Sequence, residues 1–202
     1  ILLVFCVSIS FAQDKETMIF YYDSDWKKIS QKSNAMYSRI ITFYEDDMHH
    51  PVGVVKDFYL KSGSLQWEGY FSYYDIENEE NNKEHGRVVW YYENGIKSRE
   101  SYFDHGELYG VTNYWHENGK LEVSYEYNNG MLDGEVSFYN EKGTLYKTVD
   151  YSGGKINGFI SFYYTNGFNK GNARWVKEYI NGEPKDKWAL EFDEYGKCTY
   201  TA

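Results

Sequence analysis

The chain has 202 residues, and its 31 acidic and 21 basic side chains give a formal net charge of −10. Nucleic-acid and anionic lipid partners need Lys and Arg to meet phosphates, so this balance, without any basic run, argues against both. Aromatic residues make up 20% of the sequence, with 23 Tyr against 2 Pro, a composition that favours β-structure and excludes a disordered chain.

Residues 1–12 are apolar apart from two serines and end in Ser10-Phe11-Ala12, a pattern that predicts a cleaved signal peptide before Gln13. We therefore expect an exported protein of the periplasm, the cell envelope or the extracellular space. Lipid attachment through Cys6 is the minor alternative, and removal of the segment leaves Cys198 without an intramolecular partner. No later segment has the apolar length of a membrane-spanning helix, so we expect no integral membrane segment.

Residues 13–53 contain two aromatic stretches, Phe20 to Trp26 and Tyr37 to Tyr44, which we interpret as degenerate strands that cap a repeat array. The array itself is predicted over residues 54–185. Its first unit, 54–85, is divergent and ends in an acidic loop that starts at Asp75. Residues 186–202 are predicted to form a half repeat and C-terminal cap, because arrays need atypical ends to blunt exposed sheet edges.

Four full units, 86–109, 110–133, 134–157 and 158–185, open 24 residues apart, and the last carries four extra residues. Counting from the opening glycine, glycine recurs at positions 1, 10 and 21 of the unit. These predicted turn glycines are Gly86, Gly110, Gly134 and Gly158, then Gly95, Gly119, Gly143 and Gly167, and then Gly106, Gly130, Gly154 and Gly182.

Between the glycines lie runs of strand length, and pairs such as Asn94-Gly95 are typical of tight hairpin turns with positive φ. Turn signals every 10 to 14 residues, without helical periodicity between them, predict one hairpin per unit. The expected fold is all-β: an elongated, twisted, single-layer antiparallel meander of 24-residue hairpins.

Alternation along each first strand puts positions 3, 5 and 7 on one face and positions 4 and 6 on the other. Both faces carry an aromatic column, and a third column lies at position 18 of the return strand. Aromatic cross-strand pairs contribute roughly 0.2–1 kcal/mol each, which suits a sheet without a second layer. The position 6 column consists of Tyr91, Trp115, Tyr139 and Tyr163.

The cycle of Tyr-Tyr-x-Asn-Gly followed by Tyr-x-x-Gly-x-Leu-x-Gly resembles the variant MORN repeat of bacterial proteins known as YwqK-like antitoxins. The resemblance covers 54–200 and is strongest over 86–182. Tyr21 to Trp26, with Tyr37 and Phe43-Tyr44, is similar to the N-terminal part of secreted Bacteroidota members. The resemblance implies an elongated hairpin array that contacts proteins or lipids, and an antitoxin-like, partner-neutralising role.

The residues do not indicate a reaction centre or a cofactor. The acids at position 8, Glu93, Glu117 and Glu141, lie two strands apart, about 10 Å, which is wider than the carboxylate spacing of glycosidases. No nucleophile or phosphate-loop motif appears. The histidines share no column, so we expect solvated side chains and no metal site, with adventitious binding by His49-His50 as the alternative.

We therefore expect a non-catalytic scaffold that binds a protein through an aromatic and acidic sheet face, since Tyr and Trp dominate interface hot spots. Carbohydrate binding by the same aromatic strip is the open alternative. The predicted interaction face comprises the position 6 rings and the position 8 acids, namely Tyr91, Trp115, Tyr139, Tyr163, Glu93, Glu117 and Glu141.

Overall fold

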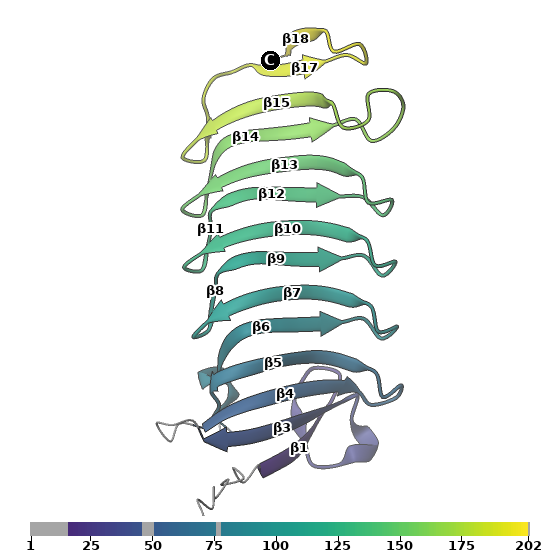
Figure 1. The fold of residues 1–202 in the computed structure, drawn as a ribbon, viewed down its shortest axis with the longest axis vertical. Coiled ribbons are helices and arrows are strands. Elements are labelled where there is room, and N and C mark those ends of the chain that lie inside the picture. The colour runs from purple at the N-terminus through teal and green to yellow at the C-terminus, as the bar shows by residue number, and fades with distance from the viewer. Residues whose placement is uncertain (1–15, 46–50, 76–77, 202) are drawn as a thin grey trace, which may run out of the picture.

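The protein is a single open antiparallel sheet of 18 strands, as seen in a computed structural model that describes residues 16–45, 51–75 and 78–201 (Figure 1). The N-terminal part contains β1 (Glu16–Tyr22), β2 (Lys28–Ile29), η1 (Lys32–Asn34), β3 (Tyr37–Glu45), β4 (Pro51–Tyr59), β5 (Leu65–Tyr73) and η2 (Glu79–Asn81). The proposed signal peptide lies outside the described residues.

The repeat array and the C-terminal segment follow, with the two-residue strands β8, β11 and β16 between groups of longer ones. Their elements are β6 (Lys83–Tyr91), β7 (Lys97–Asp104), β8 (Glu107–Leu108), β9 (Gly110–Trp115), β10 (Leu121–Asn128), β11 (Met131–Leu132), β12 (Gly134–Tyr139), β13 (Leu145–Ser152), β14 (Lys155–Tyr163), β15 (Ala173–Ile180), β16 (Glu183–Pro184), β17 (Ala189–Phe192) and β18 (Cys198–Thr201).

Each predicted unit forms one hairpin, and neighbouring hairpins join edge to edge. Strand β6 pairs with β7, β9 with β10, β12 with β13 and β14 with β15, all antiparallel. Pairings of β7 with β9, β10 with β12 and β13 with β14 join consecutive units. The expected all-β hairpin meander is therefore confirmed, and Figure 1 shows its elongated form.

The turns at position 10 differ from the predicted geometry. Gly95 has φ of 82°, but Asn94 is not among the residues with positive φ. The Gly95 amide donates to the Tyr92 carbonyl at 2.9 Å, and the Asn94 side chain instead accepts from the Ile96 amide at 2.9 Å. The pairing shifts between Trp90 and Tyr91. These features define a type I turn followed by a glycine bulge rather than a two-residue turn.

The turns at positions 20 and 21 are the tight two-residue hairpins. Both central residues have positive φ, from 48° to 92°, as type I′ turns require. The pairs are His105–Gly106, Asn129–Gly130, Gly153–Gly154 and Asn181–Gly182.

The position 1 glycines have positive φ, but they do not lie in turns. The sequence prediction that they would is wrong. They begin or interrupt strands, as Gly158 does within β14. A Cβ atom at Gly158 would lie 2.7 Å from the Asp150 Cβ, and the Asp150 carboxylate accepts a 2.8 Å hydrogen bond from the Phe159 amide. The glycine therefore makes room for a carboxylate that bonds the neighbouring strand.

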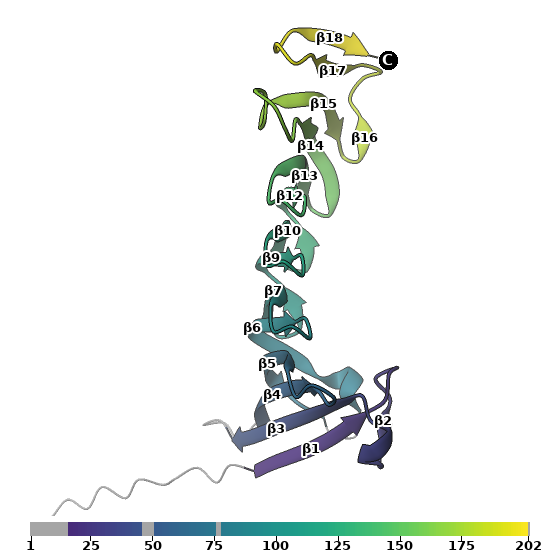
Figure 2. The same ribbon diagram turned by 90° about the vertical axis from the view of Figure 1, so that its right-hand side faces the viewer.

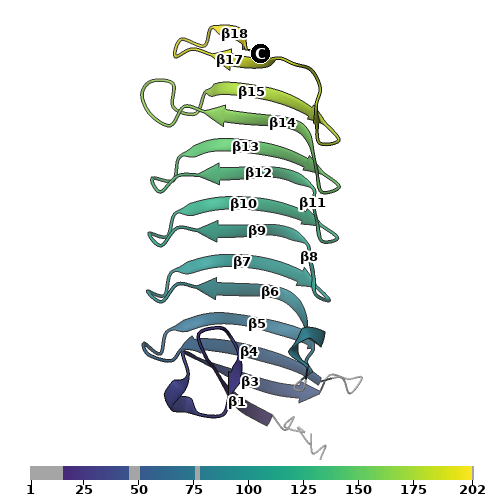
Figure 3. The ribbon, with the colours of Figure 1, turned by 180° about the vertical axis from the view of Figure 1, so that it is seen from behind.

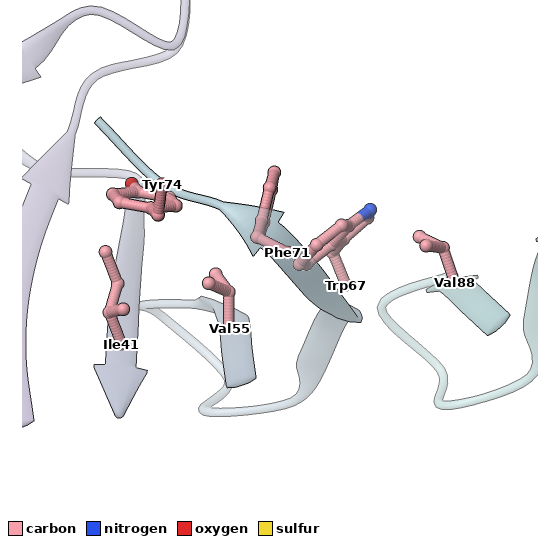
Figure 4. Close-up of a cluster of buried hydrophobic side chains, with 6 residues drawn as sticks. All are labelled: Ile41, Val55, Trp67, Phe71, Tyr74 and Val88. Atoms are coloured by element: carbon pink, nitrogen blue, oxygen red, sulfur yellow. The ribbon is translucent and has the colours of Figure 1, made fainter. Parts of the chain in front are cut away.

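The hydrophobic core lies on one face of the sheet, which we call the core face. Its buried side chains near the N-terminal end all point to the same side of their strands (Figure 4). A second cluster formed by Val123, Val136 and Val149 continues on the same face further along the array. The cluster in Figure 4 comprises Ile41, Val55, Trp67, Phe71, Tyr74 and Val88.

The sheet departs from a pure single layer at its N-terminal end. The segments between β1 and β3 and between β5 and β6 fold over the core face there (Figures 2 and 3). Tyr22 and Tyr74 are 2% and 4% exposed under this cover, and Ile41, Val55 and Val88 are fully buried. These two buried tyrosines therefore lie where the chain covers its own sheet, whereas Val89, Thr112 and Val136 are buried elsewhere along the array.

Candidate binding face

The predicted position 6 rings lie half-buried on the face opposite the core. The Tyr91 hydroxyl donates to Glu68 at 2.8 Å, and the Tyr163 hydroxyl contacts the Thr148 hydroxyl at 3.1 Å. The Lys97 ammonium lies 4.5 Å from the Trp115 ring centroid. Several polar or π contacts of this column are therefore made within the chain, as expected for cross-strand packing.

The predicted acids do not extend that column. Glu93, Glu117 and Glu141 are exposed in the hairpin turns, on the rim of the sheet. The backbone carbonyls of Glu117 and Glu141 accept hydrogen bonds from Asn94 and Asn118 of the preceding unit, at 3.2 and 2.8 Å. The predicted rings and acids therefore occupy a sheet face and the turn ridge beside it, and do not form one continuous column.

On the core face, aromatic rings and cationic side chains of neighbouring strands lie side by side in a row. Arg99 lies 4.3 Å from the Trp90 ring centroid and 5.3 Å from that of Tyr114. Lys147 lies 5.0 and 5.5 Å from the centroids of Phe138 and Phe162. A cation on a return strand is thus held between rings of two successive units, which fixes the spacing of the row.

Four tyrosines gather on the core face in the middle of the array, and we call Tyr114, Tyr125, Tyr127 and Tyr151 the tyrosine patch. The Tyr125 ring lies 5.8 Å from Tyr114 and 6.1 Å from Tyr127, centroid to centroid. Burial raises the pKa of Tyr125, and the neighbouring phenols raise it further. Within the described ranges, none of the four hydroxyls is hydrogen-bonded to another protein group. These four hydroxyls are therefore available to form hydrogen bonds with a ligand or with water.

A recess of about 560 Å³ adjoins the tyrosine patch. Tyr125, Phe138 and Tyr146 supply aromatic surface to it, and Glu122 and Glu141 supply carboxylates. Tyr139 also lines it, so two of the predicted interaction residues, Tyr139 and Glu141, do border this hollow. Sequence alternation missed Glu122 and Tyr146, because the glycine bulge shifts the register where the return strand begins.

A second recess of about 550 Å³ lies between the sheet and the N-terminal cover. Asp57 is 2% exposed and accepts two 2.8 Å hydrogen bonds from Arg39, which also donates to Glu79 at 2.9 Å. The Tyr22 hydroxyl donates to Glu79 at 2.5 Å. Burial raises the pKa of Asp57, although Arg39 opposes that shift. The network ties the covering segment between β5 and β6 to β1, β3 and β4.

His85 and His105 come together with Asp104 elsewhere, although the histidines share no column of the repeat. His85, Asp104 and His105 are all exposed, and one potential ligand atom from each lies within 4.8 Å of the others. Sequence spacing did not reveal this group because His85 lies in β6 and His105 in the turn after the adjacent β7, at different repeat positions.

No family model matches the sequence, and no curated protein matches it. Among the residues with assigned structure, no helix has the length and apolar character needed to cross a membrane.

Proposed function

We propose that the protein is a non-catalytic scaffold that binds a partner protein through the tyrosine patch and its adjoining recess. The observation that carries the proposal is a half-exposed aromatic surface with four unpartnered hydroxyls, on a face that the chain covers only at its N-terminal end. Tyrosine suits such a surface because its ring supplies apolar area and its hydroxyl a directed hydrogen bond.

The charge around the recess defines the complementary partner. Glu122 and Glu141 line it, whereas no lysine or arginine does. The nearby Lys147 is held between Phe138 and Phe162. With a chain charge of −10, the matching surface is an apolar strip flanked by Lys or Arg.

The absence of catalysis is part of the proposal. The most buried carboxylate among the described residues, Asp57, has both oxygens occupied by Arg39. A general acid or nucleophile needs an oxygen that can reach a substrate. Asp57 therefore fits a structural role better than a chemical one.

Export and membership of the variant MORN class are further parts of the proposal, supported by residues 1–12 and by the 24-residue cycle. The antitoxin-like role is one form that binding to a protein partner would take. Fractionation of source cells with an antibody to the chain tests export, and recovery in the cytoplasm alone would contradict it.

The binding test compares one exposed residue on each face, with the immobilised chain exposed to an envelope extract. Tyr146, 37% exposed, lines the recess, and Phe159, 47% exposed, lies on the opposite face. We expect Tyr146→Lys to lose a defined partner that Phe159→Lys and Trp115→Ala retain, with unchanged circular dichroism. If Phe159→Lys or Trp115→Ala loses the partner and Tyr146→Lys retains it, the partner binds the position 6 face instead of the recess.

Carbohydrate binding remains the alternative, because aromatic rings and carboxylates also line sugar sites. The orientation of the rings favours a protein ligand over a sugar. Tyr114 and Tyr125 meet edge to face at 78°, whereas sugars stack on open ring faces. If the chain gives a signal on a glycan array and Tyr146→Lys abolishes it, the ligand of the recess is a glycan and not a protein.

A further inference from the structure

The chain brings two imidazoles and a carboxylate together at the edge where β6 begins and β7 ends. Gly86 pairs with Phe103, so His85 and Asp104 follow as neighbours one residue beyond that pair. His85 Nδ1 lies 3.5 Å from Asp104 Oδ1, and His105 Nδ1 lies 2.6 Å from the same oxygen. His85 lies in β6, Asp104 ends β7 and His105 follows in the turn between β7 and β8, so the β6–β7 register sets their spacing.

This donor set matches the chemistry of a divalent transition metal. Neutral imidazole nitrogens and a carboxylate oxygen bind Zn²⁺ at about 2.0–2.2 Å, and tetrahedral donors then lie about 3.3–3.5 Å apart. The group already spans 2.6 to 4.8 Å between potential donors, so small rotations of exposed side chains complete the geometry. The two rings meet at 61° with centroids 4.9 Å apart, which brings the imidazoles to a common point.

The backbone at His105 adds a second, independent observation. His105 has φ of 48°, at a turn position where the other full units place Asn129, Gly153 and Asn181. Asn and Gly adopt the left-handed region most readily, so a bulkier imidazole there carries a conformational cost. Strained positions that persist are enriched at functional sites. The unit that has histidine in this turn, 86–109, also supplies Asp104, and His85 is the last residue of the unit before it.

We propose that His85, Asp104 and His105 form a Zn²⁺ site with at least one coordination position open to water or to an outside ligand. The exposure of Asp104 at 63% and of His105 at 73% leaves the outer side of the ion accessible. The Lys83 side chain packs beside the adjacent Gly106 turn. Its ammonium lowers the affinity, so the site is weaker than a closed four-ligand site.

The test is titration of the full chain with ZnCl₂ by isothermal calorimetry. We expect one saturable site, with affinity reduced by more than about tenfold in His85→Asn and in His105→Asn. His105→Asn is the sharper variant, because Asn occupies the same turn position at 129 and 181 and the hairpin should fold unchanged. Thermal unfolding should show a Zn²⁺-dependent rise in Tm for the natural chain that both variants lose.

The adjacent pair His49-His50 is the alternative site at which the chain could bind Zn²⁺. The double variant His49→Ala/His50→Ala should retain the site and its Tm shift. Loss of binding in that variant with retention in His105→Asn would overturn the proposal, as would an absence of saturable binding. Equal competition by Mg²⁺ would also overturn it, because a site built on two imidazoles discriminates against a metal that prefers oxygen ligands.

Discussion

The Tyr92 hydroxyl donates a 2.6 Å hydrogen bond to the backbone carbonyl of Trp115, one repeat further along the chain. The position 7 residue of two other units makes the same bond: His116 Nε2 reaches the Tyr139 carbonyl at 3.1 Å, and Tyr164 the Phe192 carbonyl at 2.7 Å. The carbonyl lies where the glycine bulge interrupts strand pairing. Position 7 therefore couples successive units at a place where the sheet ladder is incomplete.

Tyr92→Phe tests this coupling. The ring is kept while the hydroxyl is removed, so we expect a loss of about 1 kcal/mol in the free energy of unfolding. Urea denaturation followed by circular dichroism measures it. Tyr195→Phe is the control because Tyr195 is 87% exposed and should change stability little. Equal effects of the two substitutions would show that the inter-repeat bond adds nothing.

The buried ion pair at the N-terminal end yields a larger prediction. Asp57→Asn leaves the Arg39 guanidinium, whose side chain is 14% exposed, without its bidentate partner. Removing one member of a buried pair costs about 3–5 kcal/mol, and we expect the lower end because Glu79 remains. Lys56→Met breaks the exposed 3.7 Å pair with Glu68 and should cost less than about 1 kcal/mol. Comparable losses in chemical denaturation would contradict a structural role for Asp57.

The repeat array could be predicted from the sequence because glycines mark every turn and rings recur in register. The Arg39–Asp57 pair could not, since β3 lies outside the array, β4 lies mostly in its divergent first unit, and no glycine pair sets their register. Glu122 and Tyr146 were missed for another reason. A bulge inserts one residue after the position 10 turn, so strict alternation fails there and these side chains line the core-face recess.

Alkaline titration tests the hydrogen bond between Tyr91 and Glu68. Burial, reinforced by the hydrogen bond to Glu68, raises the pKa of Tyr91 to about 12. The folded state therefore favours the neutral phenol, whose stabilisation is complete below the unfolded pKa of about 10 and is lost as pH rises through about 12. We expect Tyr91→Phe to reduce the fall in stability over this range. Glu68→Gln should lower the pKa in the phenolate difference spectrum, and an unchanged titration would show that the hydrogen bond has no influence.

Two glycines with positive φ should respond to substitution in opposite ways. Gly153, with φ of 55°, has nothing within 4 Å of an added Cβ and occupies the turn position that Asn129 and Asn181 hold at 48° and 51°. Gly153→Asn should therefore be neutral or slightly stabilising, because it also restricts the unfolded chain.

At Gly158, φ is 124° and an added Cβ would lie 2.6 Å from the Asp150 Oδ2 atom. Gly158→Ala should cost more than about 2 kcal/mol, because an unfavourable backbone conformation is combined with displacement of a carboxylate that bonds the Phe159 amide. Removing the neighbouring side chain, its Cβ included, in Asp150→Gly/Gly158→Ala should recover only the steric part, so that the double variant stays less stable than Asp150→Gly alone. Equal stability of those two chains, measured by urea denaturation, would mean that the glycine serves only to admit the carboxylate and that its backbone conformation is free of cost.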